Sequence, residues 1–363
     1  MTIAGELGAV GGSEIAQLRL TAGLAAVGWD VELLYVARGD LWPQWHDIAS
    51  KAKPIRSSQF ERSAPLRSSI GAAGAVIDLL RSDCDVIYAH NPGDLPVASV
   101  AARARRIPVV VHLHVPPPFR QPAWMNRMIR GAAAVITPSN DAATRWSDVA
   151  ALSPHRVHVI PTGIDVDHFT PLSDPEREAE RRSLGLDPTI PVVLYAGRFD
   201  QTKGLSELLR ALVHVRERVN LVLCGAGRDQ DYTESLRRES RDLPVTWVPR
   251  RADVGSLLGA ADLVVLPSLA FETQGLVVME AMACGTPAIA SDVGGLPETL
   301  TAFPDHLVPP GDTVALAEAI SRVVGWRKHS PDLGRRSREW VADHLAMAHS
   351  ITAVSTLLGG LAP

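Results

Sequence analysis

The feature that most constrains the fold is a regular alternation of short apolar runs with amphipathic helical stretches. Residues 109–111 are Val-Val-Val and residues 263–266 are Leu-Val-Val-Leu. A strand without polar alternation has both faces buried, which is typical of a parallel sheet covered by helices. The pattern predicts a doubly wound α/β fold with helices over 13–27, 204–217, 275–284 and 313–324, and with strands over 31–36, 85–89, 108–113, 133–138, 157–160, 191–197, 219–225, 244–248, 262–267 and 286–290.

These strands fall into two groups of five, separated by a charged, turn-rich segment. Residues 166–190 combine three prolines with several Glu and Arg, which is typical of a linker. We therefore expect two Rossmann-like doubly wound domains that face each other across a cleft. The first spans 1–165 and the second 191–329, and a helical tail over 330–363 packs back toward the first domain.

A Gly-rich turn near the N-terminus lacks the long strand that usually precedes such a turn. Gly8, Gly11 and Gly12 lie just before the expected helix 13–27, and only the run Thr2-Ile3-Ala4 precedes them as a strand candidate. We therefore expect either a very short first strand or a sequence that starts inside the natural gene.

Charge, cysteine content and hydropathy exclude several classes of protein. The net charge is −4, and residues 1–165 carry 16 Lys and Arg against 14 Asp and Glu, so nucleic-acid binding is not expected. The cysteines at 84, 224 and 284 have neither disulfide nor zinc spacing. Because we find no apolar run of about 18 residues and no signal peptide, we expect a cytoplasmic protein.

One stretch of the first domain is rich in arginine and has no acidic residue. It could face phosphates or the anionic inner face of a membrane as a peripheral contact, or its side chains could simply solvate helix surfaces. Its arginines are Arg103, Arg105, Arg106, Arg120, Arg127 and Arg130.

Two glutamates eight residues apart flank the start of the helix expected over 275–284. Glu272 precedes this helix and Glu280 lies in its second turn. The free N–H groups at Gly275, Leu276 and Val277 and the positive end of the helix dipole would attract a phosphate. Carboxylates would accept hydrogen bonds from sugar hydroxyls. The alternative is a surface helix with two incidental acids.

Two cations bracket the loop that follows the strand expected over 191–197. Arg198 and Lys203 lie before the glycine that opens the next helix, Gly204. Ligands of open α/β sheets bind at the carboxyl ends of the strands, so both side chains are placed to neutralise a diphosphate. An exposed turn with solvated charges is the alternative.

Histidines lie at the ends of two expected strands of the first domain. Alternation places His112 and His114 on one side of their strand, and His90 ends the strand over 85–89 at the same edge. We interpret His112 as a packing residue, and no third ligand has a spacing that supports a metal site. The Asp-x-Asp pairs at 165 and 229 are read as turn or cap residues.

Taken together, these segments resemble the retaining glycosyltransferases of family 4, the glycosyltransferase group 1 type, which have the GT-B fold. The resemblance covers nearly the whole chain. It is carried by Gly11-Gly12, His114 and the Glu272…Glu280 pair, and by the segments 160–169, 197–204, 261–268, 283–287 and 294–298.

The resemblance implies a role for each matching residue. Glu280 would bind the donor ribose, Glu272 the hydroxyls of the donor sugar, and His114 would lie beside the reacting sugar. Arg198 and Lys203 would hold the diphosphate, assisted by the amides of 275–277 and the Gly11-Gly12 loop. This chain has Gln274 where the family commonly has an aromatic residue.

The implied function is transfer of a sugar, with retention, from a UDP- or GDP-sugar to a hydroxyl of a glycan, lipid or natural product. The resemblance implies no metal and no cofactor. Other classes remain open: a sugar-nucleotide epimerase or a phosphorylase of the same fold, and a non-catalytic nucleotide-sugar-binding subunit. Trp42, Trp45 and Trp124 could stack on the acceptor.

Overall fold

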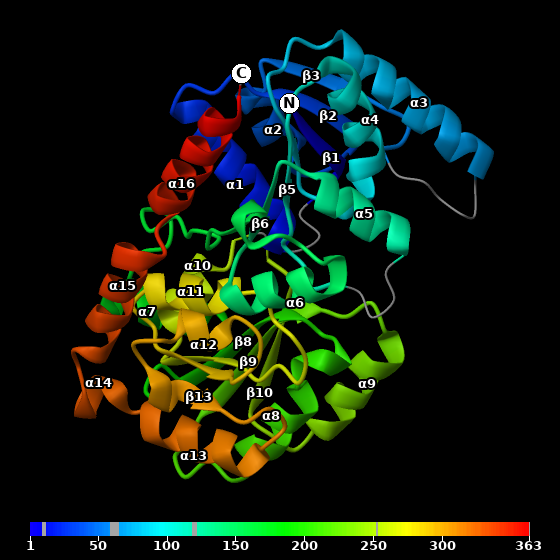
Figure 1. Ribbon diagram of the computed structural model, residues 1–363. Coiled ribbons are helices and arrows are strands. Elements are labelled where there is room, and N and C mark those ends of the chain that lie inside the picture. Colours follow the sequence, from blue (N-terminus) through cyan, green and yellow to red (C-terminus); the bar gives the residue numbers. More distant parts are fainter. Residues whose placement is uncertain (9–11, 59–64, 118–121, 252, 363) are drawn as a thin grey trace. The chain divides into compact units, whose positions relative to one another are not determined.

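The chain forms two compact α/β units in a computed structural model (Figure 1). The structure describes residues 1–363 apart from 9–11, 59–64, 118–121, 252 and 363. The first unit comprises Met1–Gly163 together with Met347–Pro363, and the second comprises Ile164–Ala346. The predicted linker segment 166–190 therefore lies within the second unit.

The first unit is built on a parallel sheet of seven strands in the order β3-β2-β1-β4-β5-β6-β7. Starting from β1, the chain adds β2 and β3 on one side and then returns to place β4 on the other. The strands are β1 (Thr2–Leu7), β2 (Glu32–Arg38), β3 (Lys51–Pro54), β4 (Ile87–Ala89), β5 (Val109–His112), β6 (Ala134–Thr137) and β7 (Val157–Val159).

The first strand is six residues long, so the expectation of a very short one is wrong. β1 extends to Leu7 and pairs with both β2 and β4, which makes it a central strand. Its side chains at Ile3, Ala4 and Leu7 are buried. The sequence concealed its length because Gly5 and Glu6 interrupt the apolar run.

Helices cover the first sheet. They are α1 (Gly12–Ala26), α2 (Trp42–Ile48), α3 (Pro65–Arg81), η1 (Pro92–Asp94), α4 (Leu95–Arg105), α5 (Ala123–Gly131), α6 (Asn140–Ala150), η2 (Pro154–Arg156) and α16 (Met347–Leu361).

Helix α16 packs along α1, so residues from opposite ends of the sequence share one core (Figure 1). Gly23 permits this approach, because a Cβ atom there would lie 2.1 Å from Cδ1 of Ile351. The indole of Trp29 also donates a hydrogen bond to Ser355 Oγ at 2.9 Å.

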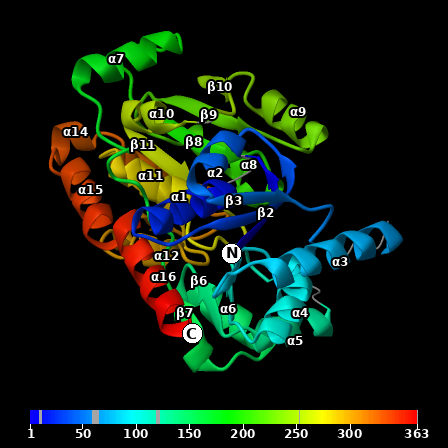
Figure 2. The same cartoon turned by 90° about the horizontal axis from the view of Figure 1, so that it is seen from above.

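The second unit has a parallel sheet of six strands in the order β10-β9-β8-β11-β12-β13. Figure 2 shows β10, β9 and β8 side by side. The strands are β8 (Val192–Arg198), β9 (Asn220–Ala226), β10 (Val245–Pro249), β11 (Leu263–Leu266), β12 (Ala288–Ser291) and β13 (Leu307–Val308). The sequence pattern predicted all of these strands except β13.

The second sheet is also covered by helices. They are α7 (Asp174–Ser183), η3 (Gln201–Lys203), α8 (Leu205–Leu212), α9 (Gln230–Glu239), α10 (Gly255–Ala260), α11 (Leu276–Ala283), α12 (Leu296–Thr299), η4 (Pro304–His306), α13 (Thr313–Val323), α14 (Trp326–His329) and α15 (Leu333–His344).

Part of the segment predicted as a linker is anchored in the second unit. Helix α7 begins with a capping box between Ser173 and Glu176. Its Arg181 is buried and donates hydrogen bonds to Asp262 Oδ2 at 2.7 Å and to the carbonyl of Ala260 at 2.8 Å. A buried charge of this kind needs such partners, so α7 is a structural part of the unit.

The predicted tail 330–363 is divided between the two units. Helix α15 packs on α11 in the second unit, and its Arg338 donates to backbone carbonyls of Phe169 and Val166. Only α16 belongs to the first unit.

Candidate functional site

Each unit offers a ligand position where the direction of strand addition reverses. In the second unit this point lies between β8 and β11, because the chain builds outward through β9 and β10 before it returns to β11. Open α/β sheets bind ligands in the crevice at the carboxyl ends of such strands. The loops that follow β8 and β11 are the two motifs predicted to contact a diphosphate and a sugar.

These two loops are joined by an ion pair. Lys203 Nζ contacts Glu272 Oε1 as a close ion pair, and both side chains are largely buried, with 17% and 14% exposure. The same carboxylate oxygen accepts a hydrogen bond from Ser268 Oγ at 2.6 Å. The backbone N–H of Leu269 donates to the carbonyl of Thr202 at 2.7 Å. The structure therefore brings Lys203 and Glu272 together. It adds Ser268, which lies in the resemblance segment 261–268 but had no predicted role.

Two glycines allow the loops to approach this closely. Gly204 has φ +68°, and a Cβ atom there would lie 1.9 Å from the carbonyl oxygen of Pro267. Gly294 has φ +59°, and a Cβ atom would lie 2.0 Å from the carbonyl oxygen of Glu272. Residues with a Cβ atom avoid this backbone region. Glycine at these two positions therefore allows the loops that carry Lys203 and Glu272 to lie close together.

The other predicted residues of the second unit line the same edge of the sheet. Arg198 is the last residue of β8 and is exposed, and its carbonyl accepts a hydrogen bond from Tyr195 OH at 2.6 Å. Gly275 is the N-cap of α11, with φ +76°. The first N–H groups of a helix have no acceptor within it, so those of Leu276 and Val277 suit an anion. Glu280 follows on α11 and is half-buried.

Gln274 faces the protein interior. It is 4% exposed, and its amide lies 3.4 Å from Met279 Sδ. The backbone carbonyl of Gln274 accepts a hydrogen bond from Thr299 Oγ1 at 2.7 Å. Gln274, which stands where the family commonly has an aromatic residue, is therefore packed in the interior beneath the loop that follows β11.

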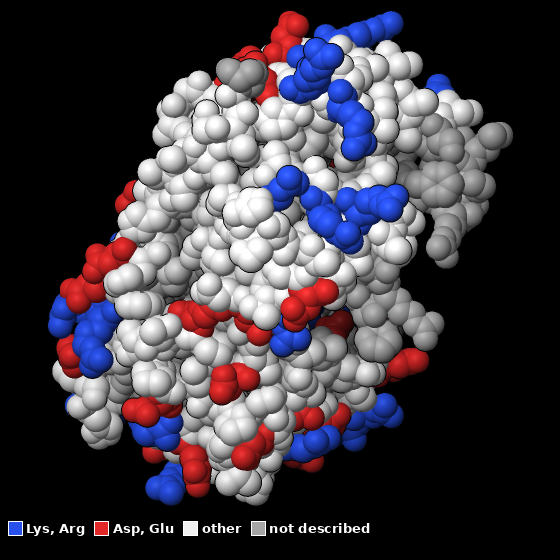
Figure 3. All heavy atoms as spheres, in the orientation of Figure 1, with Lys and Arg blue, Asp and Glu red and all other residues white. Residues whose placement is uncertain are grey.

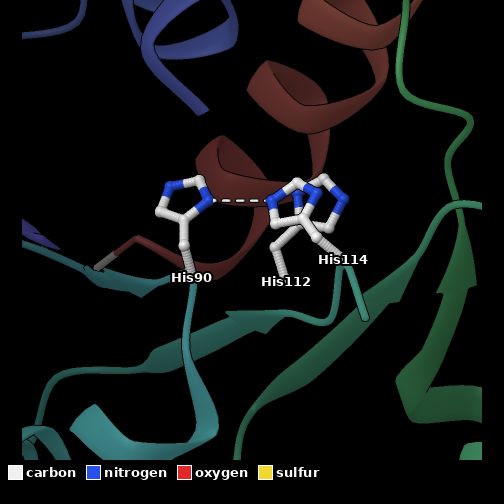
Figure 4. Close-up of side chains that lie close together, drawn as sticks. All are labelled: His90, His112 and His114. Atoms are coloured by element: carbon white, nitrogen blue, oxygen red, sulfur yellow. Dashed lines mark hydrogen bonds between the residues drawn. The ribbon is translucent and has the colours of Figure 1, made fainter. Parts of the chain in front are cut away.

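In the first unit, three histidines form a stacked cluster at the carboxyl ends of β4 and β5 (Figure 4). His90 Nδ1 and His114 Nε2 share a hydrogen bond of 3.1 Å. The rings of His112 and His114 stack with centroids 3.8 Å apart. His112 Nδ1 also bonds Tyr88 OH at 2.7 Å. The packing role expected for His112 is confirmed, and Tyr88 is a member that the sequence did not indicate.

Burial keeps these imidazoles neutral. It lowers the pKa of His90 and of His112 well below the usual value for histidine, and it lowers the pKa of His114 to about 4. The neighbouring rings lower the first two further. A neutral ring both donates and accepts a hydrogen bond, so His114 is suited to bind a sugar hydroxyl.

The cluster also has the ligand types of a metal site. One nitrogen from each of the three rings lies within 4.8 Å of the others. His112 and His114, however, are stacked with centroids 3.8 Å apart and an interplanar angle of 27°, so an ion close to one ring's nitrogen would lie well outside the plane of the other ring. The sequence spacing did not identify His90 as a third ligand because it lies on a separate strand.

The remaining predicted residues are the glycines before α1 and the two Asp-x-Asp pairs. Gly12 is the first residue of α1, whereas Gly11 lies outside the described residues. Asp165 Oδ1 accepts hydrogen bonds from the backbone N–H groups of Asp167 and His168. Asp229 caps α9 through Tyr232 N. The turn and cap interpretation of both Asp-x-Asp pairs is confirmed.

The predicted acceptor tryptophans do not share one environment. Trp45 is 2% exposed in a core cluster, so its predicted stacking on an acceptor is wrong: α2 turns this side chain toward the sheet. Trp42 packs against Tyr35 and beneath the Arg38 guanidinium. Trp124 on α5 is 45% exposed.

The arginine-rich stretch serves several purposes. Arg105 is engaged with the Leu79 carbonyl, Ser82 Oγ and Cys84 Sγ. Arg103, Arg106 and Arg127 are exposed, and Arg120 lies outside the described residues. Arg105 therefore has a structural role, whereas Arg103, Arg106 and Arg127 are open to solvent.

Two doubly wound parallel units, each with polar residues at its switch point, match the architecture of GT-B glycosyltransferases. The Anabaena protein HepE, solved in complex with UDP, superimposes with a TM-score of 0.84 over 99% of both chains at 23% identity. Sucrose-phosphate synthase from Thermosynechococcus elongatus superimposes with a TM-score of 0.80 over 99% of both chains at 24% identity.

Sequence comparison gives the family. Residues 10–168 match the family described as Glycosyltransferase Family 4, and residues 190–325 match Glycosyl transferases group 1. The chain belongs to the family 4, group 1 type glycosyltransferases.

Two curated relatives are 28% identical to this chain. One is α-maltose-1-phosphate synthase of Mycobacterium tuberculosis, over 77% of this chain and 82% of the relative. The other is D-inositol 3-phosphate glycosyltransferase of Xylanimonas cellulosilytica, over 91% of this chain and 86% of the relative.

Proposed function

We propose that this glycosyltransferase moves a sugar from a nucleoside diphosphate to an acceptor hydroxyl, with retention at the anomeric carbon and without a metal ion. The observation that carries the proposal is the Lys203–Glu272 pair at the switch point of the second unit. We assign its cation to the diphosphate and its carboxylate to the sugar. The HepE complexes with UDP and with UDP-glucose support this donor class.

The donor would bind along the carboxyl edge of the second sheet. Arg198 and Lys203 would contact the diphosphate, and the N–H groups of Gly275, Leu276 and Val277 would donate to it. Glu280 would accept hydrogen bonds from the ribose, and Glu272 from the donor sugar. The Gly11-Gly12 loop would assist from the first unit.

Retention would follow from a reaction on a single face of the sugar. The bond between the anomeric carbon and the diphosphate oxygen breaks, and its electron pair passes to that oxygen. The acceptor oxygen bonds to the anomeric carbon on the same face, and its proton passes to the departing phosphate oxygen. Arg198, Lys203 and the start of α11 would stabilise the negative charge that develops. Neutral His114 would hold a hydroxyl of the sugar.

The acceptor would be a glycan, a lipid or a small natural product. The names of two relatives, α-maltose-1-phosphate synthase and D-inositol 3-phosphate glycosyltransferase, favour a sugar or polyol that carries phosphate. We place the reaction in the cytoplasm, with a peripheral contact at the inner face of the membrane if the acceptor is a lipid. No helix in the part of the chain that the structure describes is both long and apolar enough to cross a bilayer.

The donor assignment is tested by a thermal-shift screen with UDP, GDP and ADP, followed by turnover with the matching sugar nucleotides. We expect one diphosphate to raise the Tm and the matching sugar nucleotide to be turned over. Glu280→Ala should abolish both the rise in Tm and the turnover. Glu318→Ala, an exposed change on α13, serves as the matched control. No stabilisation by any diphosphate would overturn the donor site.

Product analysis separates the alternatives. Sugar conversion without an acceptor would indicate an epimerase, and a requirement for free phosphate would indicate a phosphorylase. Saturable donor binding without hydrolysis or transfer to any acceptor would indicate a binding subunit. Inversion at the anomeric carbon would exclude the same-face reaction.

A further inference from the structure

A small cavity lies in the first unit, at the edge of the sheet opposite the histidine cluster. It measures about 270 Å³ and is lined by the end of α5, by the segment after α6 and by η2. These segments precede β6 and β7 in the chain, so the cavity is at the amino ends of the strands. His90 and His114 follow β4 and β5 at the carboxyl ends. The cavity is therefore separate from the candidate site.

The polar lining of this cavity includes two arginines. Arg130, Arg156 and His155 contribute to its wall together with Ser153, and no acidic residue lines it in the described part of the chain. Ile129 and Val135 supply an apolar surface, next to which a charge interaction is screened less than in water. In Figure 3, Lys and Arg side chains gather over the α5 region of this unit.

Both guanidinium groups are held in place by backbone carbonyls. Arg130 Nε donates to the carbonyl of Ala150 at 3.0 Å. Arg156 Nη1 donates to the carbonyls of Arg130 and Ala132 at 3.1 and 3.2 Å. A guanidinium has five N–H groups, so each arginine keeps donors beyond those used here. Within the described residues, neither arginine forms a salt bridge to a carboxylate.

We propose that this cavity binds a phosphate group. Two guanidiniums fixed in advance match the several oxygens of a tetrahedral phosphate, and they lose little side-chain freedom on binding. The hydrogen-bonded pair of Ser153 Oγ and His155 Nδ1, 2.8 Å apart, adds two further polar groups. The phosphate would come from a soluble phosphomonoester or from an anionic lipid headgroup.

The test measures binding of inorganic phosphate by calorimetry. Arg130→Gln/Arg156→Gln should weaken binding by about tenfold or more. All four arginines concerned are exposed, and Arg103→Gln/Arg127→Gln removes the same charge from two that do not line the cavity. This variant should bind as the unmodified protein does. Unchanged binding by the cavity variant would overturn the proposal, as would the absence of phosphate binding in the unmodified protein.

The donor site also attracts phosphate, so Lys203→Gln is measured in parallel. If phosphate binding persists in Lys203→Gln but is lost in Arg130→Gln/Arg156→Gln, the cavity proposal is supported, whatever the outcome of the donor assays. Binding that is lost with Lys203→Gln and kept in the cavity variant overturns the cavity proposal and leaves the donor site standing.

A second variant guards against misfolding, because the guanidiniums also hold backbone carbonyls. Ser153→Ala/His155→Gln leaves both arginines intact and should weaken phosphate binding severalfold, with the Tm of the unliganded protein unchanged. Glycerol phosphate and vesicles of phosphatidylglycerol, with phosphatidylcholine vesicles as reference, distinguish the two sources. If binding of glycerol phosphate or of phosphatidylglycerol vesicles is weakened by Arg130→Gln/Arg156→Gln, the site is supported. If neither binding changes in this variant, the proposal is overturned.

Discussion

Lys203 and Glu272 lie 69 residues apart in the sequence and form an ion pair at the carboxyl edge of the second sheet. The cation that we assign to the donor diphosphate is therefore already neutralised by the carboxylate that we assign to the donor sugar. A bound diphosphate would compete with Glu272 for the ammonium group. The pair thus couples binding of the diphosphate to binding of the sugar. When Lys203 turns to the diphosphate, Glu272 is freed to accept hydrogen bonds from the sugar.

Replacing the cation tests the diphosphate contact. Lys203→Ala should weaken binding of the nucleoside diphosphate by about tenfold or more, because a charge-assisted hydrogen bond to phosphate is lost. Calorimetry with the diphosphate measures this change. Lys328→Ala, an exposed lysine on α14, should leave the affinity unchanged; an equal loss in both variants would contradict a specific contact.

Replacing the carboxylate should separate binding from turnover. Glu272→Gln retains the shape of the side chain but releases Lys203 from its ion pair, so we expect the diphosphate to bind as well as before or more tightly. Sugar transfer should nevertheless fall by about tenfold or more, because the charged acceptor for the sugar hydroxyls is gone. Parallel calorimetry and turnover assays test this split. Weaker diphosphate binding together with normal turnover would refute both assignments.

The histidine cluster predicts a loss of stability in acid. His90, His112 and His114 have a lower pKa in the folded protein than the ordinary value of 6.5, because burial disfavours their charged forms. As the pH falls from about 6.5 toward 4, the unfolded chain binds protons that the folded chain does not. The free energy of unfolding therefore decreases, by up to about 1.4 kcal/mol per pH unit for each histidine.

Thermal unfolding followed between pH 7 and pH 4.5 measures this dependence. His112→Gln should flatten the slope of stability against pH, even if it lowers the Tm at every pH. The exposed His329→Gln change should leave the slope unaltered, and identical slopes in the two variants would argue against the cluster as the cause.

Metal removal should not affect transfer. Arg198, Lys203 and the N-terminus of α11 would supply the positive charge that a divalent cation provides in other sugar transferases. Activity should persist in excess EDTA and should not rise on addition of Mg²⁺ or Mn²⁺. Loss of turnover in EDTA, with recovery on adding one of these ions, would show that these groups are insufficient.

Strands buried on both faces were predictable, because a segment such as β5 is apolar at nearly every position. The edge strand β3 escaped prediction because its sequence, Lys-Ala-Lys-Pro, is polar, which suits an exposed sheet edge. Glu6 hid the length of β1 in a similar way. The direction of Trp45 depended on which face α2 turns toward the sheet, and this is set by tertiary packing.

The motifs of the candidate site were visible in the sequence, but the partners of their residues were not. Spacing places Lys203 and Glu272 on separate loops, and only the adjacency of β8 and β11 brings them into contact. His90 joins His114 for the same reason, because β4 and β5 are neighbours in the sheet. Side-chain contacts between loops depend on strand order, which local pattern does not determine.

The return of α16 to α1 has a consequence for biosynthesis. Leu20 and Leu24 of α1 share a core cluster with Val354 and Leu358 of α16, and the whole second unit is encoded between these helices. A ribosome must therefore translate the second unit before the first can complete its core, although domains generally fold in order from the N-terminus. The nascent first unit would expose the apolar face of α1 throughout that interval, and would be a natural client for chaperones.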